Sequence, residues 1–148
     1  MDRKEEFYDL MNIIYDVSDK ISSYEKNPRT YGTDDLLHMI EAHTIEIIGN
    51  NKEITSSEIA KKMYKTKGAV SQTIDKLIQK GLVVKNSHPK DNRKFILELT
   101  ENGKIVFGHH RRKDETAFDR YLDRLEEYSD EDFKNCKDIL CKIFKLNT

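Results

Sequence analysis

The sequence has few cysteines and no long apolar segment, and both shortages restrict what the chain can be. Cys136 and Cys141 are its only cysteines, and their five-residue spacing points them to different sides of a helix. We therefore expect no disulfide between them and a reducing, cytoplasmic location. Apolar runs last only a few residues, far short of the ~20 needed to cross a membrane. Met1 to Glu6 is mostly charged with no apolar core behind it, so no signal peptide is expected.

Catalytic motifs are also lacking. The sequence contains no glycine-rich phosphate loop, no nucleophile motif and no metal-plus-glutamate motif. Glu41 and Glu46 lie five residues apart on a predicted helix and would not face each other as an acid/base pair. We therefore expect a chain that is not an enzyme.

Apolar residues make up only 36% of the 148 residues, where about 45% is ordinary for a globular domain. Long amphipathic helices that share a core with a second copy of the chain would explain this shortage.

Positive charge is concentrated in one segment. Lys61 to Lys94 contains ten basic residues and only two acidic ones, a net charge of +8. The rest of the chain has 16 basic and 25 acidic residues, a net charge of −9. The basic segment also has apolar periodicity, so it should fold. A folded basic patch on an acidic chain is typical of a protein that binds a polyanion.

Apolar spacing and capping residues predict six helices. They are expected over about 4–26, from near Asp34 to Gly49, from the capping box Thr55–Glu58, over 67–80 between Thr66 and Gly81, from Thr100 to about 125, and after Ser129. Val70, Ile74 and Leu77 should form a buried stripe, and the last helix should bury Phe133, Leu140, Ile143 and Phe144.

Two short β-prone runs interrupt the helices. Leu82–Lys85 and Phe95–Leu99 flank the polar, turn-rich stretch Ser87–Lys94, which predicts a hairpin with a basic tip. The expected order is α-α-α-α-β-β-α-α. Two short helices followed by a hairpin make a winged helix-turn-helix, here residues 34–99, in a mainly α chain.

Such a unit reads DNA by placing its second helix in the major groove. The helix at 67–80 is the candidate. Ser71 and Gln72 are the expected base contacts, and Lys67 and Lys76 suit phosphates. Gly68 would let the backbone come close, and Ser56 can add a phosphate contact at a helix N-terminus.

The hairpin tip carries further candidates. Lys90 and Lys94 suit phosphates, and Arg93 can enter the minor groove, where the potential is most negative. Asp91 would pair with Arg93 and aim it. The alternatives are a solvated lysine-rich surface, or a winged helix that binds protein instead of double-stranded DNA.

Several motifs resemble the MarR family of winged-helix repressors. They are Ile54–Ala60, Lys80–Val83, Asp91-Asn92-Arg93 and Leu99–Gly103. The resemblance implies an obligate homodimer that binds a pseudopalindrome, with residues 1–33 and 100–148 forming the dimerisation helices. It also implies control by a ligand held between the dimerisation and DNA-binding parts.

Two segments, His43–Gly49 and His110-Arg111-Arg112, are similar to the fatty-acid-synthesis repressor (FabT-type) branch. That branch uses long acyl chains on acyl carrier protein as corepressor. Its ligand pocket would include His43 and His110, and an acyl tunnel could be lined by Ile14, Ile47, Ile48 and Phe107. Arg111 and Arg112 could meet the acidic carrier protein.

A zinc site is the alternative for the histidines. His43 could approach His109 or His110, Asp114 follows His110 by four residues, and Glu25 is a candidate third ligand. The chain lacks the cysteine ligand of the zinc-responsive branch, so structural histidines are favoured and no metal is expected. The two cysteines are likewise interpreted as buried apolar residues of a dimer helix, since the peroxide-sensing branch has its thiol near the N-terminus.

Overall fold

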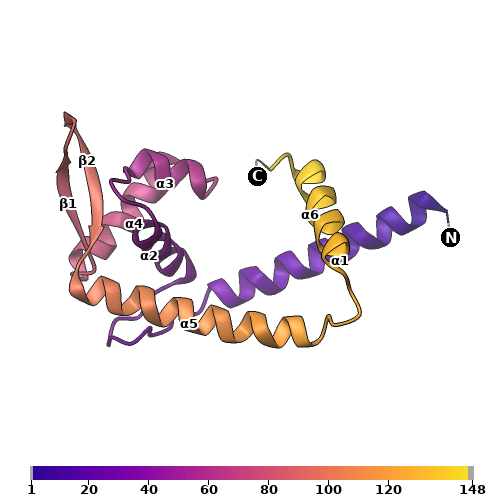
Figure 1. Ribbon diagram of the computed structural model, residues 1–148. Coiled ribbons are helices and arrows are strands. Elements are labelled where there is room, and N and C mark those ends of the chain that lie inside the picture. Colours follow the sequence, from indigo (N-terminus) through magenta and orange to yellow (C-terminus); the bar gives the residue numbers. More distant parts are fainter. Residues whose placement is uncertain (1, 147–148) are drawn as a thin grey trace. The chain divides into compact units, whose positions relative to one another are not determined.

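The computed structural model describes residues 2–146 and has the expected order of elements (Figure 1). The elements are α1 (Arg3–Glu25), α2 (Met39–Asn50), α3 (Ser56–Lys62), α4 (Lys67–Gln79), β1 (Val83–His88), β2 (Asp91–Leu99), α5 (Glu101–Asp123) and α6 (Asp130–Phe144). The chain divides into two compact units, the first ending at Arg111 and the second beginning at Arg112. α5 runs through this boundary.

The core of the first unit lies where α2, α3, α4 and the hairpin meet. Val70, Ile74 and Leu77 are each at most 1% exposed, which confirms the predicted stripe of α4. Further buried side chains come from α2, α3, the hairpin and the start of α5, among them Ile45, Ile59, Leu97 and Val106. Removing such apolar surface from water is the main source of stability for this unit.

Most helices begin at the capping side chains that the sequence predicts. Thr55 accepts a hydrogen bond from the Glu58 backbone N–H (3.3 Å), and Glu58 accepts one from the Thr55 N–H (2.8 Å). Thr66 caps α4 through the Ala69 N–H (3.2 Å), and Thr100 accepts from the Gly103 N–H (3.0 Å). In the second unit, Ser129 starts α6 with a capping box of the same kind. These local predictions are confirmed.

The predicted start of the second helix near Asp34 is wrong, because α2 begins at Met39. Leu37 instead pairs with Arg29 in an isolated antiparallel bridge, with N···O distances of 2.9 and 2.8 Å. Glu41 accepts a hydrogen bond from the His38 N–H (2.8 Å) and so caps the helix at its actual start. Leu37 is fully buried beside the helix.

The hairpin is longer than predicted. β1 and β2 pair antiparallel and leave only Pro89 and Lys90 between them, so most of the predicted turn belongs to the strands. The register jumps between Ser87, which pairs with Phe95, and His88, which pairs with Asp91. Irregularities of this kind bend a strand and increase its local twist.

Two helices keep apolar side chains exposed within the single chain. In the first unit, α1 buries no residue, and Phe7, Val17 and Ile21 are about half exposed. In the second unit, α6 also buries none, and Phe133 and Phe144 are 40% and 44% exposed. The predicted burial of this face is therefore not met within the single chain, and it stays a prediction for a dimer.

The cysteines of α6 share this exposure. Cys136 is exposed and Cys141 is half-buried in the single chain, so their burial in a dimer helix stays a prediction. Between residues 2 and 146, no helix combines the length and the apolar character that a membrane span requires.

Candidate nucleic-acid interface

α3 and α4 form a helix-turn-helix that leaves one face of α4 open. The turn between them uses Tyr64 in a left-handed conformation (φ 52°), and the Lys65 N–H donates to the Ala60 carbonyl (3.1 Å). The predicted DNA-contacting residues of this helix are all exposed, namely Lys67, Gly68, Ser71, Gln72 and Lys76. A methyl group added at Gly68 would meet nothing within 4 Å, so a large ligand can approach the backbone there. α4 thus presents a polar and basic surface opposite its buried stripe.

The hairpin tip holds an arginine in a defined orientation. Asp91 Oδ1 accepts hydrogen bonds from the Arg93 backbone N–H (3.1 Å) and from Arg93 Nε (3.2 Å). These two bonds, the backbone one first, hold the pKa of Asp91 below its ordinary value. The predicted pairing of the two side chains is therefore confirmed, while the Arg93 side chain remains 92% exposed.

A groove of about 460 Å³, which we call the hairpin groove, lies between the start of α3 and the hairpin. It brings together three predicted residues, Ser56, Arg93 and Lys94. Its lining also includes three residues that the sequence analysis missed: Ser57, Lys85 and Phe95. The ammonium group of Lys85 lies 5.7 Å from the centre of the Phe95 ring.

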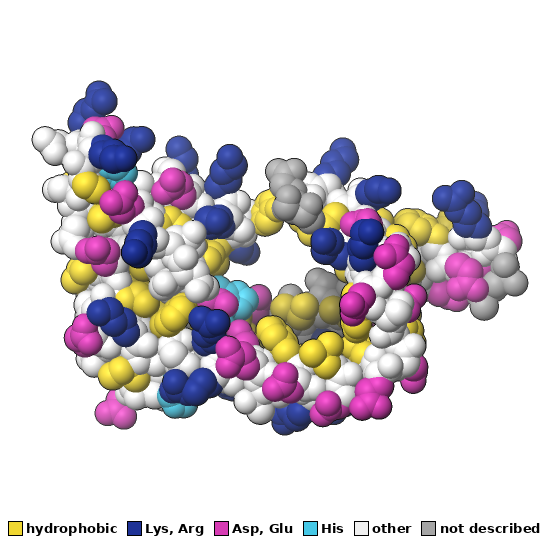
Figure 2. Space-filling view, viewed as in Figure 1, with side chains coloured by type: hydrophobic (Ala, Val, Ile, Leu, Met, Phe, Trp, Pro, Cys, Tyr) yellow, Lys and Arg dark blue, Asp and Glu magenta, His cyan; other side chains and the backbone are white. Residues whose placement is uncertain are grey.

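Strand alternation could have found two of these missed residues. Arg93 and Phe95 are two positions apart on β2 and so share a face of the hairpin. Lys85 is directly opposite Leu97, the next residue of that face. Figure 2 shows Lys and Arg side chains gathered over the hairpin tip, at the end of the first unit that carries β1 and β2. The hairpin groove is thus lined mainly by cations and hydroxyls, together with one carboxylate (Glu58), the His88 and Phe95 rings and Leu97.

A second group of functional side chains lies on α2 and α5. His43, Glu46 and His110 each offer a ligand atom within 4.8 Å of the others, and we call them the histidine cluster. His110 is only 2% exposed, and its Nδ1 lies 3.8 Å from Glu46 Oε2. The rings of His43 and His110 meet edge to face at 5.6 Å. Two imidazoles and one carboxylate form a donor set that zinc accepts, although the atoms must draw closer for bonds of ~2 Å.

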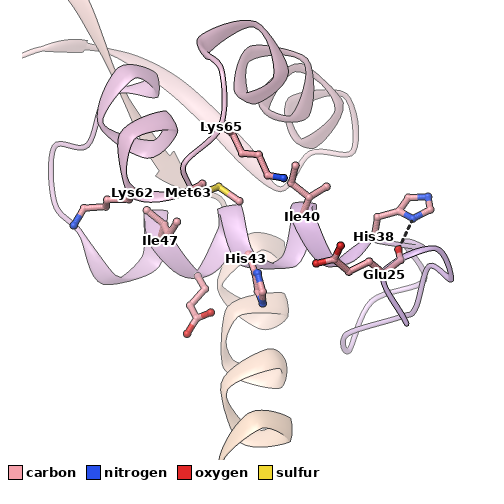
Figure 3. Close-up of a pocket in the computed structure, with 9 residues that line it drawn as sticks. Glu25, His38, Ile40, His43, Ile47, Lys62, Met63 and Lys65 are labelled. Atoms are coloured by element: carbon pink, nitrogen blue, oxygen red, sulfur yellow. Dashed lines mark hydrogen bonds between the residues drawn. The ribbon is translucent and has the colours of Figure 1, made fainter. Parts of the chain in front are cut away.

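The predicted metal ligands are only partly brought together. Glu25 lines a cavity of about 630 Å³ with His43 and Glu46, but it is not a member of the cluster (Figure 3). Asp114 lies in the second unit. The sequence analysis missed Glu46 as a ligand, although it follows His43 by three positions and so shares its helix face.

Three of the residues predicted for the acyl tunnel line two of the described cavities. Ile47 lines the cavity of about 630 Å³, whereas Ile48 and Phe107 line another of about 780 Å³. Ile14 lines neither of these two cavities. The Phe107 ring fills the space beside Gly49, where a Cβ would lie 2.4 Å from it. Arg111 and Arg112 are exposed and fall on opposite sides of the boundary between the two units.

The helix-turn-helix and most of the hairpin coincide with a known family. The sequence of residues 37–95 matches the family model of the MarR family. This segment belongs to the MarR family. The resemblance deduced from the sequence motifs is therefore confirmed.

Two relatives in Bacillus subtilis support this assignment. The chain is 28% identical to the uncharacterized HTH-type transcriptional regulator YhjH over 102 residues, 69% of this chain and 58% of that protein. It is 33% identical to the HTH-type transcriptional regulator PchR over 95 residues, 61% of this chain and 55% of that protein. The chain thus spans less than two thirds of the length of these relatives.

Solved structures confirm the winged-helix fold over nearly the whole chain. Streptococcus pneumoniae FabT in complex with DNA has a TM-score of 0.67 and 23% identity, covering 97% of this chain and 96% of that one. The zinc-responsive MarR family member ZitR of Lactococcus lactis has a TM-score of 0.67 and 20% identity, covering 92% and 97%. At these identities the likeness establishes the MarR-type fold and nothing more specific.

Proposed function

We propose that the chain is a MarR-type transcriptional regulator that binds double-stranded DNA through α4 and the hairpin. The observation that carries this proposal is the exposed polar and basic face of α4, in the same unit as a hairpin whose Arg93 is oriented by Asp91. The curated relatives are transcriptional regulators, and FabT was crystallised with DNA. Among its targets would be the promoter regions that such regulators control.

The exposed residues have distinct roles in this proposal. Ser71 and Gln72 contact base edges in the major groove, where a glutamine can bind adenine through two hydrogen bonds. Arg93 enters the adjacent minor groove. Phosphates are bound by the exposed lysines of α4 and of the hairpin, which are Lys67, Lys76, Lys90 and Lys94.

The bound form is a homodimer in this proposal. The exposed apolar side chains of α1 and α6 are the surfaces that a second copy would cover, since a solvated apolar face of that extent is unusual for a monomer. A twofold dimer would present two copies of α4 about 34 Å apart, one turn of DNA, to a pseudopalindromic site.

The test is selection of bound duplexes from a random pool, followed by binding measurements over a salt series. We expect a pseudopalindrome to be selected, and affinity to fall by orders of magnitude between 50 and 200 mM salt. Lys67→Ala should lower both the affinity and its salt dependence. Lys134→Ala, which removes an exposed lysine of α6, is the control and should change neither. A monomer that ignores duplexes at minimal salt would instead indicate a winged helix that binds protein.

A transition metal such as zinc is the effector that the geometry favours. The histidine cluster already brings two imidazoles and a carboxylate within 4.8 Å, whereas Ile47 and Phe107, two of the residues predicted for an acyl chain, line separate cavities. The cluster joins α2 to α5, so a bound ion would fix these two helices to each other.

Titration with zinc against a fluorescent chelator tests this effector. We expect competition that is lost in His43→Ala and kept in His38→Asn, because His38 lines the same cavity outside the cluster. A second arm adds acyl carrier protein with a long acyl chain to the operator complex. Tighter operator binding in that arm, together with no zinc competition, would replace the metal with the acyl corepressor.

A further inference from the structure

Lys80 differs from the other lysines of the basic segment because its ammonium group is held inside the fold. Its Nζ lies 2.6 Å from Glu41 Oε1 and 2.9 Å from the Leu36 carbonyl oxygen. The Lys80 side chain is 29% exposed and that of Glu41 only 3%. Two of its three N–H donors and its charge are thus already partnered within the chain, unlike those of the exposed lysines of α4.

Glu41 uses both carboxylate oxygens. Oε1 binds Lys80, and Oε2 accepts from the His38 N–H (2.8 Å) at the start of α2. A carboxylate this deeply buried requires such partners, since its desolvation is costly. The ion pair therefore joins the first turn of α2 to Lys80, the C-cap residue of α4.

The same end of α4 is also held by the start of α5. Gly81, with φ of +70°, follows Lys80, and its carbonyl oxygen accepts a hydrogen bond from Thr100 Oγ1 (2.6 Å). Thr100 in turn caps α5. Directed polar bonds thus fix the C-terminal end of α4 against two other helices.

The middle of α4 has a different kind of contact. Val70, Ile74 and Leu77 pack through apolar surface, and apolar contacts have no preferred direction. They hold α4 on the core, and the ion pair adds a directed restraint at its C-terminal end. Gln72 lies about 12 Å from Lys80 along the helix axis. If the ion pair were lost, a small shift of the C-terminal end of α4 would displace the base-contacting side chains.

We propose that Glu41 and Lys80 are positioning residues for DNA recognition: their buried ion pair sets the placement of α4, and Lys80 contacts no phosphate. This inference rests on the proposed DNA-binding function. It separates Lys80 from Lys76, which lies on the same helix but is exposed.

Lys80→Met tests the proposal, with Lys76→Met as the matched control. Each variant is titrated with the duplex selected by the wild-type protein and with an unrelated duplex, over a salt series and well below the unfolding temperature. Lys76→Met should weaken both complexes and reduce the logarithmic salt slope by about 0.9 for each phosphate that is no longer neutralised. Lys80→Met should keep the slope and the affinity for the unrelated duplex. Its affinity for the selected duplex should fall roughly 10- to 100-fold, the loss expected when a base contact or two is misplaced.

A second pair of variants keeps the test decisive if Lys80→Met fails to fold. Glu41→Gln breaks the ion pair from the other side and should show the same selective loss, while Lys80→Arg should retain the preference. A lower unfolding temperature with an unchanged ratio of the two affinities would overturn the proposal, because the pair would then serve stability alone. A reduced salt slope in Lys80→Met would also overturn it. A wild-type protein that binds neither duplex would instead refute the proposed function.

Discussion

Replacing Arg93 with alanine should separate DNA binding from stability. The Arg93 side chain is 92% exposed and has one ion pair, to Asp91 at 3.2 Å. Exposed ion pairs of this kind contribute at most about 1 kcal/mol. The free energy of unfolding should therefore change by less than about 1 kcal/mol, so that any loss of DNA affinity reflects the interface.

The effect on binding follows from counterion release. Each phosphate-neutralising cation contributes about 0.9 to the logarithmic salt slope, so a dimer that loses two arginines should lose about 1.8. Between 50 and 200 mM salt, this difference corresponds to a factor of about ten. The gap in affinity between wild type and Arg93→Ala should thus be about ten times larger at the lower salt concentration.

Fluorescence anisotropy with duplexes that differ only in their flanks can measure this. The loss should be larger with A·T-rich flanks, whose narrow minor groove attracts arginine. Asp91→Asn, which keeps Arg93 but weakens its orientation, should have a smaller effect on affinity. If Arg93→Ala has the same salt slope as the wild type, and the same affinity as the wild type for both duplexes, the hairpin does not contact DNA.

Three other changes have defined outcomes. Gly103→Ala should lower the free energy of unfolding by about 1–3 kcal/mol or more in urea denaturation, because the new Cβ would lie 2.0 Å from the Leu82 carbonyl oxygen. Gln72→Ala should relax specificity at one base pair by about 1–3 kcal/mol in competition with altered duplexes. Hydrogen bonds from Thr55, the backbone one first, lower the pKa of Glu58, so this cap stabilises the protein above the ordinary pKa of 4.5 and is lost as the pH falls through the lower, folded value. Acid unfolding monitored by circular dichroism should therefore be less steep in Thr55→Ala.

Local patterns in the sequence determined the helix caps and the buried face of α4. Thr55, Thr66 and Thr100 each bind a backbone group three residues away, so the participants lie within one short segment of the sequence. The stripe of α4 follows the helical period. The motifs around these positions were also sufficient to indicate the family.

Contacts between distant segments were decided only by the tertiary structure. Leu37 lies outside α2 because it pairs with Arg29, and the hairpin is long because its register shifts near the tip. Lys80 is one of the ten basic residues of the segment from Lys61 to Lys94, yet it binds Glu41, 39 residues away. Glu46 likewise joins His110 only because α2 and α5 pack together. Periodicity shows which face of a helix is buried, but the partner that a buried charge meets depends on how the helices pack.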